Sequence, residues 1–422
     1  MNADVNADAG VGEAATKRPD NTDLRFAIGR IKVAIGRGDL DAAWKVLDTA
    51  TADLDPDDLF RENLANAMRR DVGVATLKDL AGRGDHGAVV DVATDVIART
   101  TGEAGDEVYQ RLNDALVAQG VDVAERHHGL RHVSGSLDQV PDGELVCCLV
   151  VKNGMWRLDE YLESLRAQGA GRIFAIDNES SDGTLDHLTS QDEITVWRTG
   201  DQFSHANCGS AWFDVLLRRH APNAWTLILD LDEEIRVAGD PPLPEFCREL
   251  DRRGLKAATG HHVDLYPRSA TDPTLHLDRH PTVPQTGLQP FDGQTAVATG
   301  LRERVFGASS LANKAPLQRF EPGLRLCNGQ HFTHHRPEYI SSMTCVVLHH
   351  KFRAGFGERV ASVGHDESYH ATWRTANARY AALAEQIDGA MYDPDVSVPL
   401  GTTDDLVEHG IVRPLPPRDE TT

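Results

Sequence analysis

The feature of the sequence that most restricts its fold is a regular alternation of strand-length and helix-length segments, which begins at Glu144. Short apolar runs of β-forming residues alternate with amphipathic segments, and polar turns separate them. Strands that helices join in this way lie parallel in one sheet, so the pattern predicts an α/β fold. The expected strands are 145–151, 172–176, 194–197 and 225–229, and the expected helices between them are 158–168, 184–190 and 205–219.

Polar residues follow three of these expected strands. Lys152 and Asn153 follow the first, residues 177–184 follow the second, and the acidic run 230–234 follows the fourth. Ligands of a parallel sheet bind beyond the carboxyl ends of its strands, so we expect these residues to meet in one crevice.

The acidic run contains a D-x-D pattern, because Asp230 and Asp232 flank Leu231. If the strand continues through them, both carboxylates point to the same side. Hard oxygen donors at this spacing suit Mg²⁺ or Mn²⁺, which in turn bind phosphate oxygens. An acidic loop or a helix N-cap would produce the same local pattern.

Several motifs, taken in order, resemble the family 2-like glycosyltransferases with the GT-A fold. In that superfamily a strand ending in Asp precedes an S-x-D-G-T turn, and a later strand ends in D-x-D. This chain has IFAIDNESSDGT at 173–184 and WTLILDLDEEI at 225–235, and the further matches are GLRERVF at Gly300, KAPLQRF at Lys314, GQH at Gly329 and LHHKF at Leu348. The resemblance covers residues 144–412. It departs from many relatives at Gly154 and at Glu234, where they have Glu and Phe.

The resemblance implies a GT-A type fold, a Rossmann-like and mostly parallel sheet with flanking helices. It also implies an enzyme that transfers a sugar from a nucleotide-sugar donor to an acceptor hydroxyl. Asp177 would accept a hydrogen bond from the ring N–H of the base, which favours a UDP-sugar. Asp230 would hold the ribose or the metal, and Asp232 would ligate Mn²⁺ or Mg²⁺. The neighbouring nucleotide-sugar contacts are expected to be Lys152, Asn153 and Asp182.

GT-A enzymes usually complete the metal shell with a histidine, and two histidines fit that place. His349 is the first choice, because Lys351 on the same strand could face the same diphosphate. His331 in G-Q-H is the second choice. Either histidine could equally be a buried, hydrogen-bonded residue.

Transfer with inversion needs a base that takes the proton of the acceptor hydroxyl. Asp264 is our candidate, since it ends an expected strand, although a turn-capping aspartate would look the same. Arg302, Arg304 and Lys314 form a basic region that could meet phosphate or an anionic acceptor.

The residues before Glu144 have a different texture. Residues 1–21 are predicted to be a disordered leader, and residues 22–120 a helical region with helices at 24–35, 40–50, 57–70, 72–81, 88–99 and 103–119. The similar segments GRGDLDAAW at Gly36 and GRGDHGAVV at Gly82 suggest tetratricopeptide-like hairpins, which either dock a protein partner or cap the next domain. We expect a linker at 121–143 and a loose tail at 413–422.

Composition limits the remaining possibilities. The net charge of −22 argues against a nucleic-acid partner, and no apolar run is long enough for a transmembrane segment. The six cysteines contain no C-x-x-C pair and are expected to be reduced core residues. These features predict a cytoplasmic protein, either free or peripheral at the inner face of the membrane.

Two other functions fit the same pattern. A catalytically silent GT-A domain could serve as a binding scaffold, although Asp177, Asp230 and Asp232 are all present. A nucleotidyltransferase also gathers carboxylates and a metal on an α/β sheet, but this chain has no Gly-rich, basic phosphate loop after the first expected strand.

Overall fold

The computed structural model describes residues 22–52, 54, 59–100, 104–269, 272–284, 294, 297–306, 310–353, 355–366, 371–384 and 391–417. The predicted disordered leader and residues 418–422 of the predicted tail lie outside this part of the chain. The chain divides into two compact units, Met1–Ala75 and Thr76–Thr422, and the division falls inside helix α3 (Leu59–Gly82).

The first unit is a small helical core. Helix α1 (Thr22–Gly36) and helix α2 (Leu40–Thr51) form a hairpin, and α3 supplies further core residues. Leu24, Ile31 and Leu47 are fully buried there with Val72 of α3. Because Val72 packs into this core, α3 continues through the position at which the sequence suggested a break between two helices.

The repeated G-R-G-D segments have the same local structure in both units. Gly38 and Gly84 both have φ of 72°, the left-handed conformation that glycine adopts without strain. The next residue caps the following helix: Asp39 accepts from the backbone N–H of Ala42, and Asp85 from that of Ala88, each at 3.1 Å. The second copy opens α4 (His86–Arg99), so the sequence repeat is a repeated helix-turn-helix junction.

The predicted helical region and linker do not end where the sequence suggested. Helix α5 (Asp106–Ala118) belongs to the second unit and packs against α8 (Ser210–His220), where Asn113 donates to the carbonyl of Ala211 at 3.4 Å. The predicted linker contains a π-helical turn (η1, Val123–His127) and a strand (β1, Arg131–Ser134) that pairs with β4. That part of the chain is therefore integral to the sheet.

A mixed nine-stranded sheet organises the second unit, in the order β1-β4-β3-β2-β5-β12-β7-β13-β6. Six strands run in one direction, while β1, β12 and β6 run in the other. The predicted α/β class is confirmed at this level. The strands not yet bounded are β4 (Ile194–Arg198), β3 (Ile173–Asp177), β2 (Leu145–Val151), β5 (Trp225–Ile228), β12 (Asn313–Arg319), β7 (Ala257–Asp264), β13 (Ile340–His349) and β6 (Glu233–Val237).

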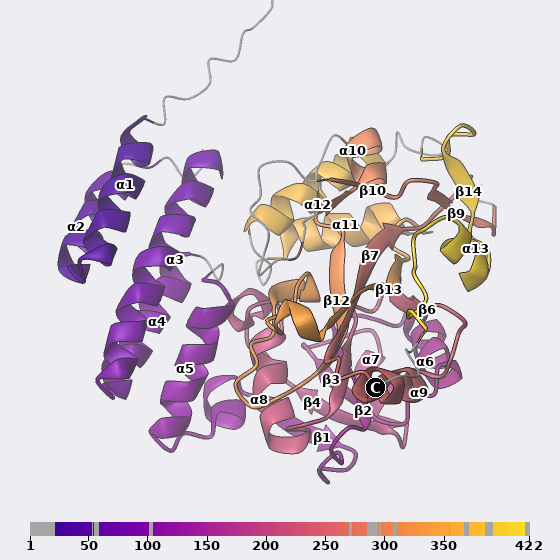
Figure 1. Ribbon diagram of the computed structural model, residues 1–422, viewed down its shortest axis with the longest axis horizontal. Helices are drawn as coiled ribbons and strands as arrows, with labels where there is room; N and C mark the ends of the chain where they lie inside the picture. Colours follow the sequence, from indigo (N-terminus) through magenta and orange to yellow (C-terminus); the bar gives the residue numbers. More distant parts are fainter. Residues whose placement is uncertain are drawn as a thin grey trace, which may run out of the picture. The chain divides into compact units, whose positions relative to one another are not determined.

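Helices cover both faces of the parallel strands (Figure 1). Cys147 and Leu149 of β2 join one apolar core with residues of α6 (Leu158–Ala167), α7 (Thr184–Thr189) and α9 (Leu243–Arg252). The alternate residues of the same strands face α8, which carries the fully buried Trp212. The expected helix at 205–219 is in fact a 3₁₀ turn (η2, Phe203–Ala206) followed by α8, because the intervening residues Asn207, Cys208 and Gly209 all have positive φ.

Most of the remaining elements lie at the end of the sheet where β7 and β13 finish (Figure 1), whereas η4 (Pro337–Tyr339) directly precedes β13 and lies at its other end. An aromatic core holds three helices together, with Phe306 of α10 (Gly300–Phe306), Phe356 of α11 (Phe356–His365) and Tyr380 of α12 (Ala371–Ala384). The minor elements are β8 (Tyr266–Pro267), β9 (Leu275–Asp278), β10 (Thr282–Pro284), β11 (Val297–Thr299), β14 (Ser397–Pro399), α13 (Thr403–Glu408), η3 (Asn328–Gln330) and η4 (Pro337–Tyr339).

The C-terminal tail differs from the expectation, and the cysteines agree with it. The tail is not loose over the described residues, because Arg413 donates its backbone N–H to Met343 at 2.7 Å and Pro416 accepts from Arg253 at 2.7 Å. The cysteines are all free thiols, as predicted, and only Cys208 is more than slightly exposed. In the part of the chain that the structure describes, no helix has the length and apolar character to cross a lipid bilayer.

Gly260 in β7 is expected to be irreplaceable, because it pairs with Cys345 of β13 and an added Cβ would lie 1.7 Å from the Cys345 carbonyl oxygen. The Gly260→Ala variant should therefore lose about 3 kcal/mol of unfolding free energy, measured by chemical denaturation. Gly171→Ala is the matched control, since its added Cβ meets nothing within 4 Å. Equal stabilities of the two variants would contradict this account of the β7–β13 contact.

Candidate active site

The D-x-D residues lie in a turn between β5 and β6 and are not part of a strand. Strand β5 ends at Ile228, and Glu233 donates its N–H to the carbonyl of Asp230 at 3.0 Å. The strand expected at 225–229 therefore does not continue through Asp230 and Asp232, and the condition under which both carboxylates would point to one side is not met. The turn is fixed by its backbone: Arg157 donates to the carbonyl of Leu231, and His350 donates its N–H to that of Asp232 at 2.7 Å. Neither Asp side chain is needed to hold the turn.

Gly154, where many of the glycosyltransferases have glutamate, packs against this turn. A Cβ at residue 154 would lie 2.4 Å from a methyl group of Val151 and 3.0 Å from one of Leu231. A glutamate at this position would displace the turn, so glycine permits the close approach of the β2–α6 loop to the D-x-D segment.

His349 faces Asp232, as the sequence predicted for the metal site. Its Nε2 lies 3.2 Å from Oδ2 of Asp232, and its Nδ1 lies 2.7 Å from Oδ1 of Asp264. Strand register causes this, since His349 of β13 is paired with Glu233 of β6 on one side and with Asp264 of β7 on the other. Burial lowers the pKa of His349, but the two aspartates outweigh burial and raise it.

Asp264 lies behind His349 and is nearly inaccessible. Arg302 of α10 binds it through two hydrogen bonds, of 2.9 Å from Nε and 2.7 Å from Nη2. Burial would raise the pKa of Asp264, but Arg302 and His349 hold it well below its usual range. The predicted role of Asp264 as a base stays untested, while the geometry favours a role in orienting His349. Arg302 was expected to meet phosphate and is instead the buried partner of this carboxylate.

The structure brings two of the three predicted metal ligands together, Asp232 and His349, whereas Asp230 does not lie within 4.8 Å of both. A histidine that ligates a metal normally donates its other ring N–H to a carboxylate. Nδ1 of His349 lies 2.7 Å from Asp264, where it can donate in that way, and 2.9 Å from Nη2 of Arg302. The Nε2 atom then points toward Asp232, whose side chain is 25% exposed and so remains accessible. The mixture of imidazole and carboxylate suits Mn²⁺ better than Mg²⁺. His331, the second choice, is held at the carbonyl of Asn313 at 2.9 Å, and burial lowers its pKa to about 4.

A buried charged cluster supports the D-x-D turn and was not anticipated. Glu233 is 2% exposed, and its Oε1 lies 2.8 Å from Nζ of Lys314 and 3.0 Å from Nε2 of His262. Its Oε2 accepts the backbone N–H of Asp230 at 3.0 Å. Lys314 therefore does not face solvent phosphate, contrary to expectation. The charged residues next to D-x-D and in K-A-P-L-Q-R-F were visible in the sequence, but their pairing was not.

The Asp230 carboxylate is exposed at the mouth of this cluster. Removal from water by the surrounding protein raises the pKa of Asp230, and the neighbouring Glu233 carboxylate raises it further. Asp230 also borders a pocket of about 20 Å³, the space of about one water molecule. Glu233, Lys314 and Gln330 line the same pocket, so its wall joins the cluster to η3.

Asp177 ends β3 and is completely buried, next to Val151 of β2 in the register. Its carboxylate accepts the N–H of Ser180 at 3.3 Å and lies 3.4 Å from Nε of Arg198. Arg198 ends β4, is 38% exposed at its side chain, and was missed because a lone arginine after a strand carries no motif. The two side chains form one polar patch at the carboxyl ends of adjacent strands.

Asn153 and Asp182, which were expected to contact the nucleotide, instead connect two loops. Asn153 accepts the N–H of Ser181 at 2.8 Å, and Asp182 accepts that of Met155 at 3.1 Å, so each ties the loop after β2 to the loop after β3. Lys152 pairs with Asp366 at the end of α11 at 2.7 Å. These side chains position the rim of the site, and their direct contact with a nucleotide stays a prediction.

Lys351 lies just beyond His349 with its Nζ 5.3 Å from the ring centre of Tyr380. Burial and the nearby Arg302 lower the pKa of Lys351 to about 8. The amine therefore remains mostly protonated at neutral pH and adds positive charge next to Asp232. Arg304, the third residue of the basic region, pairs with Asp278 at 2.7 Å.

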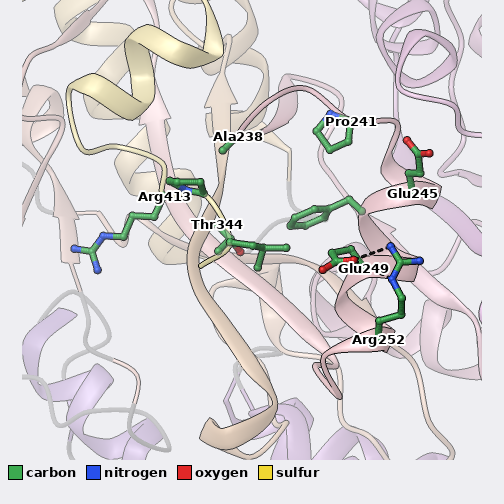
Figure 2. A pocket seen from close by; sticks show the side chains of 10 residues that line it. Ala238, Pro241, Glu245, Glu249, Arg252, Thr344 and Arg413 are labelled. Carbon is green, nitrogen blue, oxygen red and sulfur yellow. Dashed lines mark hydrogen bonds and ion pairs between the residues drawn. The ribbon is translucent and has the colours of Figure 1, made fainter. Parts of the chain in front are cut away.

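A larger pocket of about 400 Å³ lies away from these residues (Figure 2). Ala238, Phe246 and Leu415 are among its lining residues, and Ala238 follows the end of β6 opposite to Glu233. Two glutamates line it, Glu245 and Glu249, and Glu249 is paired with Arg252 at 2.6 Å (Figure 2). The pocket therefore lies at the opposite end of β6 from Glu233 and the D-x-D turn.

In comparison with known proteins, no family model matches the chain and no curated protein is significantly similar to it. The likeness to the GT-A glycosyltransferases thus rests on the sequence motifs.

His261 provides a prediction about acid stability. It neighbours His262 on β7, and burial together with Arg413 lowers its pKa from 6.5 to about 4. Between pH 6.5 and about 4 the unfolded chain binds a proton at His261 that the folded chain does not. The contribution of His261 to the unfolding free energy is therefore complete above pH 6.5 and is lost as the pH falls. Replacing His261 by Asn should reduce this slope by at most about 1.4 kcal/mol per pH unit.

The measurement is the unfolding free energy from denaturant titrations at several pH values between 4 and 7. The exposed His86 replaced by Asn is the control and should retain the parental slope. An unchanged slope in the His261 variant would show that this histidine is protonated equally in both states.

Proposed function

We propose that this chain is a metal-dependent glycosyltransferase of the GT-A type, which transfers a sugar with inversion from a nucleoside-diphosphate donor, preferably a UDP-sugar, to an acceptor hydroxyl. The observation that carries the proposal is the Asp232–His349 pair at 3.2 Å, with His349 held from behind by Asp264. A cytoplasmic location and a protein partner for the helical hairpins remain parts of the same hypothesis.

Asp232 and His349 would hold the cation, and Asp230 would have to turn toward it to serve as a further oxygen donor. The cation, when bound, would neutralise the charge that develops on the leaving diphosphate. Asp264 and Arg302 hold the ring of His349 in place, and with the proton on Nδ1 donated to Asp264 the Nε2 lone pair would face Asp232 and the cation. Lys351 would add a positive charge at the same place.

The nucleotide would lie where the strand order of the sheet reverses. From β2 the chain continues outward to β3 and β4 and then returns to β5 on the other side of β2. Crevices at such reversals are the usual ligand sites of parallel sheets. Asp177, the last residue of β3, and Asp230, after β5, flank this position, which supports the proposed site; because Asp177 is completely buried, its contact with the base would need the loop at Ser180 to open.

The intact cluster argues against a silent scaffold. Two ion pairs are buried here, Glu233–Lys314 and Asp264–Arg302. Their desolvation is costly, and a simple binding platform does not need them. Their arrangement around Asp232 and His349 is better explained by a site that must hold a cation and a polyanion.

The proposal predicts cation-dependent release of a nucleoside diphosphate. A screen of nucleotide sugars with Mn²⁺, read by released diphosphate, should identify a UDP-sugar that the chain hydrolyses slowly or transfers. Asp232→Asn should lower this turnover at least about a hundredfold, because it removes the principal metal ligand. Glu163→Gln, at an exposed position of α6, is the control and should keep parental activity. Undiminished turnover in a folded Asp232→Asn chain would refute the metal assignment.

The two roles considered for Asp264 make different predictions. If Asp264 orients His349, Asp264→Asn should weaken the affinity for Mn²⁺ by about 10–100-fold and leave kcat at saturating Mn²⁺ largely intact. If it is the base, kcat should be lost at every Mn²⁺ concentration. The double variant Asp264→Asn/Arg302→Met removes both buried charges and controls for an unpaired Arg302.

Asp177 should determine the choice of base. A carboxylate accepts the ring N–H of uracil but repels the unprotonated ring nitrogen of cytosine, so UDP should bind better than CDP. Asp177→Ala should weaken UDP binding about 10–100-fold, since a charge-assisted hydrogen bond contributes about 1.5–3 kcal/mol. Calorimetric titration with inorganic pyrophosphate is the control. An equal loss of pyrophosphate affinity would mean that Asp177 only shapes its loop.

A further inference from the structure

A second group of metal-ligand side chains lies apart from Asp232. Asp106, Cys327 and His334 present a carboxylate oxygen, a thiol sulfur and an imidazole nitrogen within 4.8 Å of one another. Three different donor types from three separate positions in the sequence meet here. Among the described residues, this is the group whose atoms satisfy that spacing, and none of its members belongs to the Asp232–His349 site.

The fold brings these residues together by packing α5 beside the segment 320–339. Asp106 is the first residue of α5, Cys327 directly precedes η3, and His334 follows η3. The segment has little regular structure, because it contains only the short turns η3 and η4 between β12 and β13. Its position therefore depends on side-chain contacts.

The geometry of Asp106 is that of a prepared ligand. Its Oδ1 accepts from the side chain of Asn207 at 2.8 Å and from the backbone N–H of Asn328 at 3.0 Å. Its Oδ2 lies 3.3 Å from Nε2 of His334. Two ligand atoms on one tetrahedral zinc, each about 2.0–2.1 Å from the metal, are separated by about 3.3 Å. An ordinary ion pair explains that distance equally well, and the observation that points to a metal is the third donor, the Cys327 sulfur, within 4.8 Å of both atoms.

We propose that Asp106, Cys327 and His334 form a zinc site, with water in the fourth position. A thiolate together with an imidazole selects Zn²⁺ over Mg²⁺, Ca²⁺ or Mn²⁺, which prefer oxygen. Binding converts the Cys327 thiol to a thiolate and releases its proton to solvent. Cys327 is 5% exposed, so the zinc–sulfur bond would be protected from water.

This zinc would fix the wall of the candidate active site. Gly329 of η3 accepts from Nζ of Lys314 at 2.7 Å, and Lys314 is the ion-pair partner of Glu233. Gln330 of η3 lines the pocket that Asp230 borders. The zinc ligands flank η3 on both sides, so zinc would hold Gly329 and Gln330 in place. The site is structural in this account and takes no part in the chemistry.

The test uses the full chain, purified under reducing conditions and stripped of metal with a chelator. Titration with Co²⁺ should produce a thiolate-to-cobalt charge-transfer band in the near ultraviolet and visible ligand-field bands of tetrahedral cobalt. Zinc should bleach both bands at one equivalent per chain. The band identifies the cysteine site, because the proposed Asp232–His349 site contains no sulfur.

Three variants locate the ligands. Cys327→Ser should abolish the charge-transfer band, and Asp106→Asn and His334→Gln should each lower zinc affinity at least about tenfold. Cys247→Ala removes a buried thiol from the apolar core elsewhere and should keep the band, as should Asp232→Asn.

Absence of the thiolate band in the folded parental chain would overturn the proposal without the need for any variant. Persistence of the band in Cys327→Ser would do the same. Neither result depends on a nucleotide sugar, so the zinc site and the proposed glycosyltransferase activity stand or fall separately.

Discussion

The register of β13 between β6 and β7 is the constraint on which the candidate site depends. It pairs His349 with Glu233 on one side and with Asp264 on the other, so three ionisable residues stand in one row across adjacent strands. Residues that face each other in a ladder share a face of the sheet, and a shift by one residue would send His349 to the opposite face. The backbone hydrogen bonds of three strands therefore set the distance between His349 and Asp232, and loop geometry alone does not.

Buried charges then tie this row to other elements. Lys314 connects Glu233 to β12, and Arg302 connects Asp264 to α10. Removing one partner of such a pair leaves an uncompensated charge, which costs about 3–5 kcal/mol, whereas replacing both can be neutral. The pairs are therefore weak as sources of stability but strong as constraints on position. This is the property that a cation site requires, since ligand atoms must be placed before the cation arrives.

The sequence predicted the part of the site that local patterns encode. The strands β2, β3, β4 and β5 appear within two residues of their expected bounds, because apolar runs and polar turns report them directly. The resemblance also assigned Asp232 and His349 to one site, and the two side chains lie 3.2 Å apart, while their role as metal ligands stays a prediction. The Glu233–Lys314 pair, the Arg302–Asp264 pair and the role of β1 in the sheet were not predicted, because each depends on pairing between segments far apart in the sequence. Periodicity carries no record of such contacts.

The turn from Asp230 to Asp232 joins two halves of the sheet that are built differently. Before it, β5 belongs to the parallel half that carries Asp177; after it, β6 belongs to the half that carries His349. The chain therefore passes over the ends of β12, β7 and β13 in these few residues. Arg157 and His350 fix the backbone of the turn, and Gly154 allows close packing against it, so the turn does not depend on the two aspartate side chains. A displacement of this turn would move the proposed ribose and cation contacts together, so donor binding and cation binding should be coupled through the backbone even where no side chain links them.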